Sequence, residues 1–212
     1  MLHTAIISRV VGGCLLGLLF LPSEPSVCVA HEIPDKFVER SLSIVVRDQV
    51  ALLTYRAGLN IKTMRTLMRE WGLPPGQYAE TLSDEQLSEI FRNAAFDQIA
   101  RGLKASLDGQ PLVLHKIDCE PSSRHHFSLV ARYKIDLGKS SKPFKFEVID
   151  ENFSTQQGAI RCSLKAMGNA MVLQSNVAPI MVRAERHELE SLSASKRKDV
   201  CSVKVRLVFS PN

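Results

Sequence analysis

Two adjoining segments of the chain have the alternating pattern of β-strands. Residues 37–47 and 50–59 are rich in β-branched and aromatic side chains, and the polar pair Asp48-Gln49 lies between them. A short polar pair between two such runs is typical of a tight turn. The pattern therefore predicts a β-hairpin.

Two helices are predicted directly after this hairpin. Asn60 is a suitable N-cap for the first helix, and apolar residues follow it at helical spacing as far as Trp71. Ser83 and Gln86 have the spacing of a capping box, so we expect a second helix to begin at Ser83 and to end near Gly102. Its apolar residues form one stripe, which indicates that this helix packs on an apolar surface.

From residue 103 onward the pattern again becomes that of strands. The segments predicted as strands are 104–107, 111–119, 127–137, 144–150, 159–166, 171–173, 180–184 and 200–209. Turn signals about every 8 to 12 residues are typical of a β-sandwich. We therefore expect an α+β fold, mainly an antiparallel β-sandwich that is Ig-like in outline, with a two-helix insertion after the first hairpin.

The first 30 residues have the pattern of a secretory signal peptide. Arg9 precedes an apolar run over residues 10–21, and small residues end at Ala30, so we expect cleavage before His31. The run is shorter than the roughly 20 residues that a membrane-spanning helix needs. An uncleaved anchor and lipidation of a cysteine in the run are the alternatives. We expect residues 31–212 to form a single exported α+β domain, periplasmic or extracellular.

The composition is that of an ordinary globular protein, and the charge and motifs disfavour several kinds of partner. The 212 residues are 45% hydrophobic, and 27 basic against 22 acidic residues give a net charge of +5. This charge is too small to indicate a nucleic-acid partner. Neither G-x-G-x-x-G nor G-x-x-x-x-G-K-[ST] occurs, which disfavours nucleotide binding, and the hydrolase motifs G-x-S-x-G and H-E-x-x-H are absent. We therefore expect a protein that is not an enzyme.

Three cysteines remain after the predicted cleavage site, at Cys119, Cys162 and Cys201. An oxidising compartment permits one disulfide among them and leaves one thiol over. Each lies in a segment with a strand pattern, so small buried hydrophobic residues are the alternative interpretation. The sequence leaves the pairing open.

Two short polar motifs are candidate binding sites. Asp150, Asn152 and Ser154 stand at the first spacings of an EF-hand loop, but Thr155 and Arg161 replace the glycine and glutamate that calcium binding needs, so we reject a calcium site. The basic run at residues 196–198 falls in a serine-rich segment that we expect to be a solvated hairpin tip. A contact with phosphate or acidic lipid is its alternative.

Histidines supply the remaining candidate chemistry. After the predicted cleavage, His31 would be the first residue, and its α-amine and Nδ1 could chelate one metal ion. Such nitrogen-rich sites suit Cu²⁺ or Ni²⁺. His125 or His126 could supply a third ligand, although neighbours on a strand point to opposite faces. The alternative is a frayed terminus at His31 and a polar strand edge at the other two.

Three segments carry a family resemblance. Residues 31–37, 107–112 (with Asp108-Gly109) and 146–153 (with a D-x-N-[FY] motif) resemble the extracytoplasmic N-terminal domain of bacterial nickel/cobalt-transporter-like, hydrogenase- or urease-accessory-type membrane proteins. The resemblance covers most of residues 31–209 and implies an exported, sandwich-like domain beside a separately encoded membrane partner. His31 matches the leading histidine of that family. The membrane helices that carry transport in the family have no counterpart in this sequence.

These observations favour an exported, non-enzymatic module that binds an envelope or membrane partner and handles Cu or Ni through His31. The alternative is a structural or interaction protein of the cell envelope with no metal and no catalytic role. A third interpretation, an enzyme built from scattered residues such as Asp118, Glu120 and His125, is supported by no motif.

Overall fold

The computed structural model describes residues 34–73, 82–121, 127–140, 142–180, 182 and 184–210. Strands β1 (Phe37–Arg47) and β2 (Val50–Leu59) form the predicted hairpin. Both turn residues, Asp48 and Gln49, have positive φ angles of 47° and 69°. That combination is the type I′ turn, whose twist suits a two-residue hairpin.

The hairpin lies in a seven-stranded sheet. Its other strands are β5 (His115–Pro121), β6 (Phe127–Asp136), β8 (Gln157–Met167), β10 (Ala178–Pro179) and β11 (His187–Glu188). The strand order is β10-β8-β1-β2-β6-β5, and β11 also pairs with β8. β1 is antiparallel to β2 but parallel to β8, so it joins the early and late parts of the chain.

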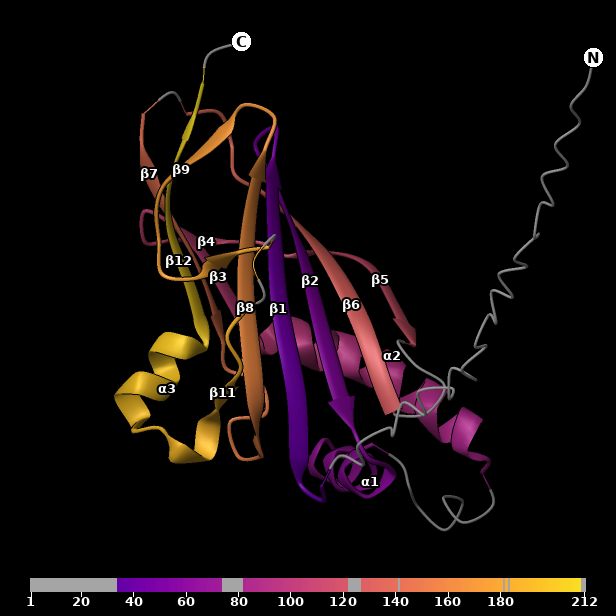
Figure 1. Ribbon diagram of the computed structural model, residues 1–212. Coiled ribbons are helices and arrows are strands. Elements are labelled where there is room, and N and C mark those ends of the chain that lie inside the picture. The colour runs from indigo at the N-terminus through magenta and orange to yellow at the C-terminus, as the bar shows by residue number, and fades with distance from the viewer. Residues whose placement is uncertain are drawn as a thin grey trace, which may run out of the picture. The chain divides into compact units, whose positions relative to one another are not determined.

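A second sheet of five strands is antiparallel throughout. Its strands are β3 (Leu103–Leu107), β4 (Gln110–Leu112), β7 (Phe144–Asp150), β9 (Ala170–Ser175) and β12 (Ser202–Phe209). The order is β4-β3-β7-β12-β9. In Figure 1, β7, β9 and β12 lie beside β8 and β1 of the larger sheet.

The inward rows of the two sheets share one hydrophobic core. Leu42 and Ile44 of β1 are fully buried, as are Phe146 and Val148 of β7. Every second residue of both strands is buried, which is the alternation expected where one face packs on a core. The predicted α+β sandwich is thus confirmed.

The two predicted helices are α1 (Ile61–Glu70) and α2 (Asp84–Gly102). The Asn60 side chain accepts a hydrogen bond from the Thr63 amide at 2.8 Å, and Ser83 forms the expected capping box. The Tyr133 hydroxyl of β6 donates to the Phe96 carbonyl of α2 at 2.9 Å, so α2 is fixed to the larger sheet. No helix in the described part of the chain is long and apolar enough to cross a membrane.

The second half of the chain differs from the prediction in three places. The described residues of the predicted strand 180–184, which are 180, 182 and 184, lie in no strand, and the two-residue strands β10 and β11 lie before and after this segment. The segment 111–119 is divided between β4 and β5. The basic run 196–198 is not a hairpin tip, because it lies in a helix, α3 (Ala194–Val200), whose N-cap is Ser193. A short 3₁₀ helix, η1 (Leu189–Ser191), precedes it.

Candidate functional site

Two charged residues occupy inward positions in the sandwich. Arg40 is in the same row of β1 as Leu42, and Asp150 is in the same row of β7 as Val148. Arg40 is 3% exposed and Asp150 is 4% exposed. A charged side chain is rarely buried to this extent unless it is paired.

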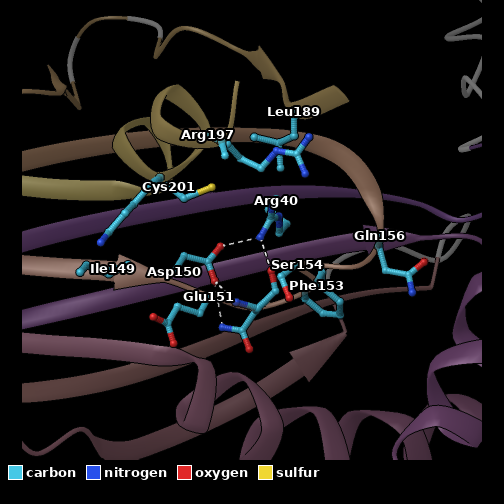
Figure 2. A pocket seen from close by; sticks show the side chains of 13 residues that line it. Arg40, Ile149, Asp150, Glu151, Phe153, Ser154, Gln156, Leu189, Arg197 and Cys201 are labelled. Carbon is cyan, nitrogen blue, oxygen red and sulfur yellow. Dashed lines mark hydrogen bonds and ion pairs between the residues drawn. The ribbon is translucent and has the colours of Figure 1, made fainter. Parts of the chain in front are cut away.

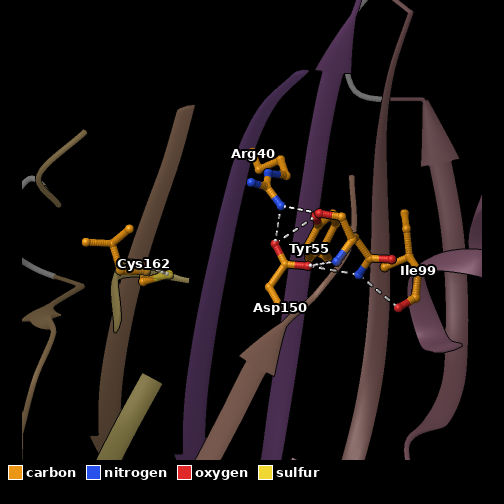
Figure 3. Close-up of polar contacts among 7 residues, drawn as sticks. Arg40, Tyr55, Ile99, Asp150 and Cys162 are labelled. Atoms are coloured by element: carbon orange, nitrogen blue, oxygen red, sulfur yellow. Dashed lines mark hydrogen bonds and ion pairs between the residues drawn. The ribbon is translucent and has the colours of Figure 1, made fainter. Parts of the chain in front are cut away.

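Arg40 and Asp150 pair with each other across the two sheets (Figure 3). Nη1 of Arg40 lies 2.9 Å from Oδ2 of Asp150, and the same nitrogen donates to the carbonyl of Asn152. The Tyr55 hydroxyl of β2 donates to Oδ2 at 3.1 Å. Oδ1 accepts from the backbone and side-chain amides of Asn152 at 3.0 and 2.9 Å. The carboxyl group thus accepts four hydrogen bonds.

The Asn152 side chain extends this network to the helical layer. Its amide also donates to the Ile99 carbonyl of α2 at 3.1 Å. Gly102, at the end of α2, lies so close that a Cβ atom there would overlap the Asn152 side chain. The absence of a side chain at Gly102 therefore lets the loop after β7 approach α2.

Burial and charge act in opposite directions on this network. Burial disfavours the charged form of Arg40, but Tyr55, Asp150 and Cys201 outweigh it and raise the pKa of Arg40. Burial raises the pKa of the Asp150 carboxyl, whereas Arg40 and the hydrogen bonds from Asn152 oppose that rise. Burial also raises the pKa of the Tyr55 hydroxyl, which therefore stays a proton donor. Arg40 is thus a fixed buried cation.

A cavity of about 690 Å³ opens beside the Arg40–Asp150 pair (Figure 2). The residues that line it come from β1, from the end of β7 and the loop that follows, and from the η1 to α3 region: Arg40, Ile149, Asp150, Glu151, Asn152, Phe153, Ser154, Gln156, Leu189, Ala194, Arg197, Lys198 and Cys201. Its volume lies within the range of about 300–1,000 Å³ that is typical of small-molecule sites.

The loop between β7 and β8 forms one wall of the cavity and is conformationally strained. Phe153 has a φ of 52°, which an aromatic residue rarely adopts. Its ring packs near Trp71, with ring centroids 6.3 Å apart. Backbone strain of this kind costs about 1 to 3 kcal/mol and tends to be retained at functional sites.

The opposite wall is formed by α3 and carries the basic run of the sequence. Arg197 and Lys198 both line the cavity, whereas Lys196 does not. Nε of Arg197 and Nε of Arg40 are buried, and no described residue accepts a hydrogen bond from either atom. The structure therefore places the basic run beside the buried network, which the sequence did not indicate.

Two cysteines lie close to this site. Cys201 lines the cavity, and in Figure 2 its sulfur points toward Arg40. Cys162 of β8 donates to the carbonyl of Val200 at 3.4 Å. The three cysteines among the described residues, Cys119, Cys162 and Cys201, are free, and burial raises the pKa of each thiol, to about 11 for Cys119 and to about 12 for Cys162. Cys162 and Cys201 are both buried, as the alternative interpretation of the cysteines as small buried residues expects.

The predicted metal ligands His31, His125 and His126 lie outside the described residues. Across the described ranges, no group of three or more His, Cys, Asp or Glu side chains is arranged to hold a metal ion. The structure therefore leaves the predicted Cu or Ni site as a prediction.

The scattered acidic residues that are catalytic candidates in the sequence form ion pairs with an arginine. Asp118 and Glu120 both pair with Arg132, at 2.7 and 3.1 Å, on the outer face of the larger sheet. In the motif considered for calcium, Asp150 accepts from Arg40, Tyr55 and Asn152, which agrees with its rejection.

The sequence contains a signal for the buried pair that our prediction missed. The strand patterns at 37–47 and 144–150 each place one charged residue, Arg40 or Asp150, in the apolar row. Charges of opposite sign at inward positions of two strands indicate a buried pair between them.

Comparison with known proteins adds no family to this description. No protein-family model matches the chain, and no curated protein matches it significantly. The resemblance to the extracytoplasmic domain of nickel/cobalt-transporter-like proteins therefore stays a prediction.

Proposed function

We propose that this chain is an exported, non-enzymatic binding module and that the cavity beside Arg40 is its ligand site. The observation that carries the proposal is the cavity of about 690 Å³ that reaches a buried arginine, whose Nε has no acceptor among the described residues. A buried donor without an acceptor is costly, and a ligand that supplies one removes that cost.

The state of the groups around the cavity supports binding rather than catalysis. The oxygens of Asp150 accept hydrogen bonds from Arg40, Tyr55 and Asn152, so they are not free to take a proton from a substrate. Burial raises the pKa of the Cys201 thiol, which keeps it in the less nucleophilic form. The other lining groups are the basic side chains of Arg197 and Lys198, the polar side chains of Glu151, Ser154 and Gln156, and several apolar residues.

The walls of the cavity are held in place before any ligand binds. Arg40 and Asn152 join two strands, the loop after β7 and α2 through five hydrogen bonds that end on Asp150, on Asn152 or on Ile99. Preorganised polar groups of this kind favour binding because little ordering remains to be done.

We would test the site by recording ¹H–¹⁵N NMR spectra while adding small organic acids, amines and neutral compounds to the protein. The expected result is that shifts concentrate on residues 149–156 and 189–201. Ala194 lines the cavity and Ser195 does not, so Ala194→Trp should abolish these shifts and Ser195→Trp should preserve them. Shifts that cluster elsewhere, or that survive Ala194→Trp, would overturn the site.

Export is tested separately from ligand binding. Cell fractionation and intact mass should show a product that begins at His31 outside the cytoplasm. A product that retains residues 1–30 in the cytoplasm would refute export. If export holds and no compound binds in the cavity, the alternative of a structural or interaction protein of the envelope is favoured.

A further inference from the structure

We infer that the cavity binds a small aliphatic carboxylate, with its anionic group against Arg197 and Arg40 and its apolar body along Ile149 and Leu189. This inference rests on the proposed function and names the ligand class of the same site. It depends on charge balance, on unsatisfied donors and on the apolar part of the lining.

The charges of the lining leave an excess of positive charge. Asp150 balances Arg40, because the two form a 2.9 Å ion pair. Arg197 and Lys198 form no ion pair with any residue that the structure describes. The other acidic lining residue is Glu151, which is exposed, so the lining has three basic and two acidic side chains. The lining thus has one net positive charge, which matches a monoanion.

Two residues that line the cavity, Arg40 and Arg197, each have a donor without an acceptor, which favours an oxygen anion. Nε of Arg40 and Nε of Arg197 are both buried, and no acceptor among the described residues reaches them. Arg40 is itself 97% buried, at 3% exposure, and faces the cavity. Guanidinium groups bind carboxylates with charge-assisted hydrogen bonds, often two at a time.

The rest of the lining favours a ligand with an apolar body over a ligand with a second charge. Ile149, Phe153, Leu189 and Ala194 supply apolar surface beside the basic groups. A phosphate monoester carries about −1.5 to −2 charges at neutral pH, which exceeds the single net charge of the lining. A carboxylate with an aliphatic chain matches both the charge and the surface.

The test is calorimetric titration of the purified protein with sodium octanoate, octan-1-ol, octyl phosphate and inorganic phosphate. We expect octanoate to bind one to one and more tightly than the other three. Arg197→Ala should weaken octanoate binding about tenfold or more, as expected for a lost charge-assisted hydrogen bond. The matched control is Lys196→Ala, which removes a charge from the same helix but not from the lining. It should leave the affinity within about twofold of the wild type.

Three results would overturn the carboxylate assignment even where octanoate binds. These are equal affinity for octan-1-ol, tighter binding of either phosphate compound, and unchanged octanoate affinity in a folded Arg197→Ala variant. If Arg197→Ala does not fold, as judged by circular dichroism, Arg197→Gln and Lys198→Ala serve the same purpose. Absence of octanoate binding while other compounds shift the cavity residues would refute the carboxylate alone. Absence of any shift in the cavity would refute the proposed site as well.

Discussion

Arg40 and Asp150 are 110 positions apart in the sequence, yet Nη1 of Arg40 lies 2.9 Å from Oδ2 of Asp150 inside the sandwich. Each single replacement, Arg40→Met or Asp150→Leu, leaves the other charge buried without its partner. We expect either variant to lose about 3 to 5 kcal/mol of unfolding free energy, measured by urea denaturation.

The double variant Arg40→Met/Asp150→Leu separates pairing from simple loss of packing. The unfolding free energy that the double variant loses should be smaller than the sum of the losses in the two single variants by about 0.5 to 3 kcal/mol. Arg47→Met is a matched control, because Arg47 lies on the same strand in an exposed pair with Asp48 and should change stability much less. Additive losses in the double variant would show that the two residues are not coupled.

Gly102 and Asn152 provide a second prediction. Alanine is favoured over glycine in a helix by about 1 kcal/mol, but a Cβ atom at Gly102 would overlap the Asn152 side chain. We therefore expect Gly102→Ala to destabilise the protein in urea unfolding. In an Asn152→Ala background the obstacle is absent, so the same replacement should be neutral or stabilising. A similar loss in both backgrounds would contradict the close approach of Asn152.

The buried thiols predict that stability falls at alkaline pH. Burial raises the pKa of Cys119 to about 11 and of Cys162 to about 12, from an ordinary value of 9.0. Above pH 9 the unfolded chain therefore loses these protons before the folded protein does, and the unfolded state is favoured. The thiols should therefore leave the urea midpoint unchanged below pH 9 and lower it as the pH rises toward 12.

A variant identifies the group responsible for this decline. In Cys162→Ala the fall should be smaller, because one of the late-titrating groups is gone. Native Cys162 should also react far more slowly with a disulfide reagent at pH 8 than the unfolded chain does. Rapid reaction in the folded protein would show that the thiol is not buried as described.

The metal prediction concerns His31, which lies outside the described residues. If processing exposes His31 as the first residue, calorimetric titration with Cu²⁺ or Ni²⁺ should show tight one-to-one binding. His31→Ala, or one residue inserted before His31, should abolish it, because both destroy the chelate of the α-amine and Nδ1. His115→Ala is the control, since this histidine is exposed on β5. Binding that survives the insertion would disprove the chelate.

The sequence predicted those elements whose signals are local. The hairpin, the capping box at Ser83 and the alternation of β7 each depend on residues within a few positions of one another, and each is confirmed. α3 was missed because its seven residues include no buried side chain, so they show no apolar periodicity. The α+β sandwich followed from the local elements, whereas the pairing of β1 with β8 did not.

The candidate site was less accessible to prediction because its parts are far apart in the chain. Arg40, the loop after β7 and α3 meet only after both sheets have formed. The charged residues at inward positions were a usable signal for Arg40 and Asp150. No comparable pattern marked Arg197, since a basic residue on a short helix is ordinary in sequence and becomes informative only through its neighbours.

The parallel pairing of β1 with β8 has a consequence for the order in which the protein folds. Val38 of β1 is paired with Gly158 of β8, so the central strand of the larger sheet lacks one neighbour until most of the chain has been made. Contacts between such distant residues slow folding, because a long loop must close before they form. We therefore expect a slow folder whose first 150 or so residues remain incompletely folded as they leave the ribosome. For the export that we propose, a chain that stays open in this way is suited to crossing a membrane as an unfolded polypeptide.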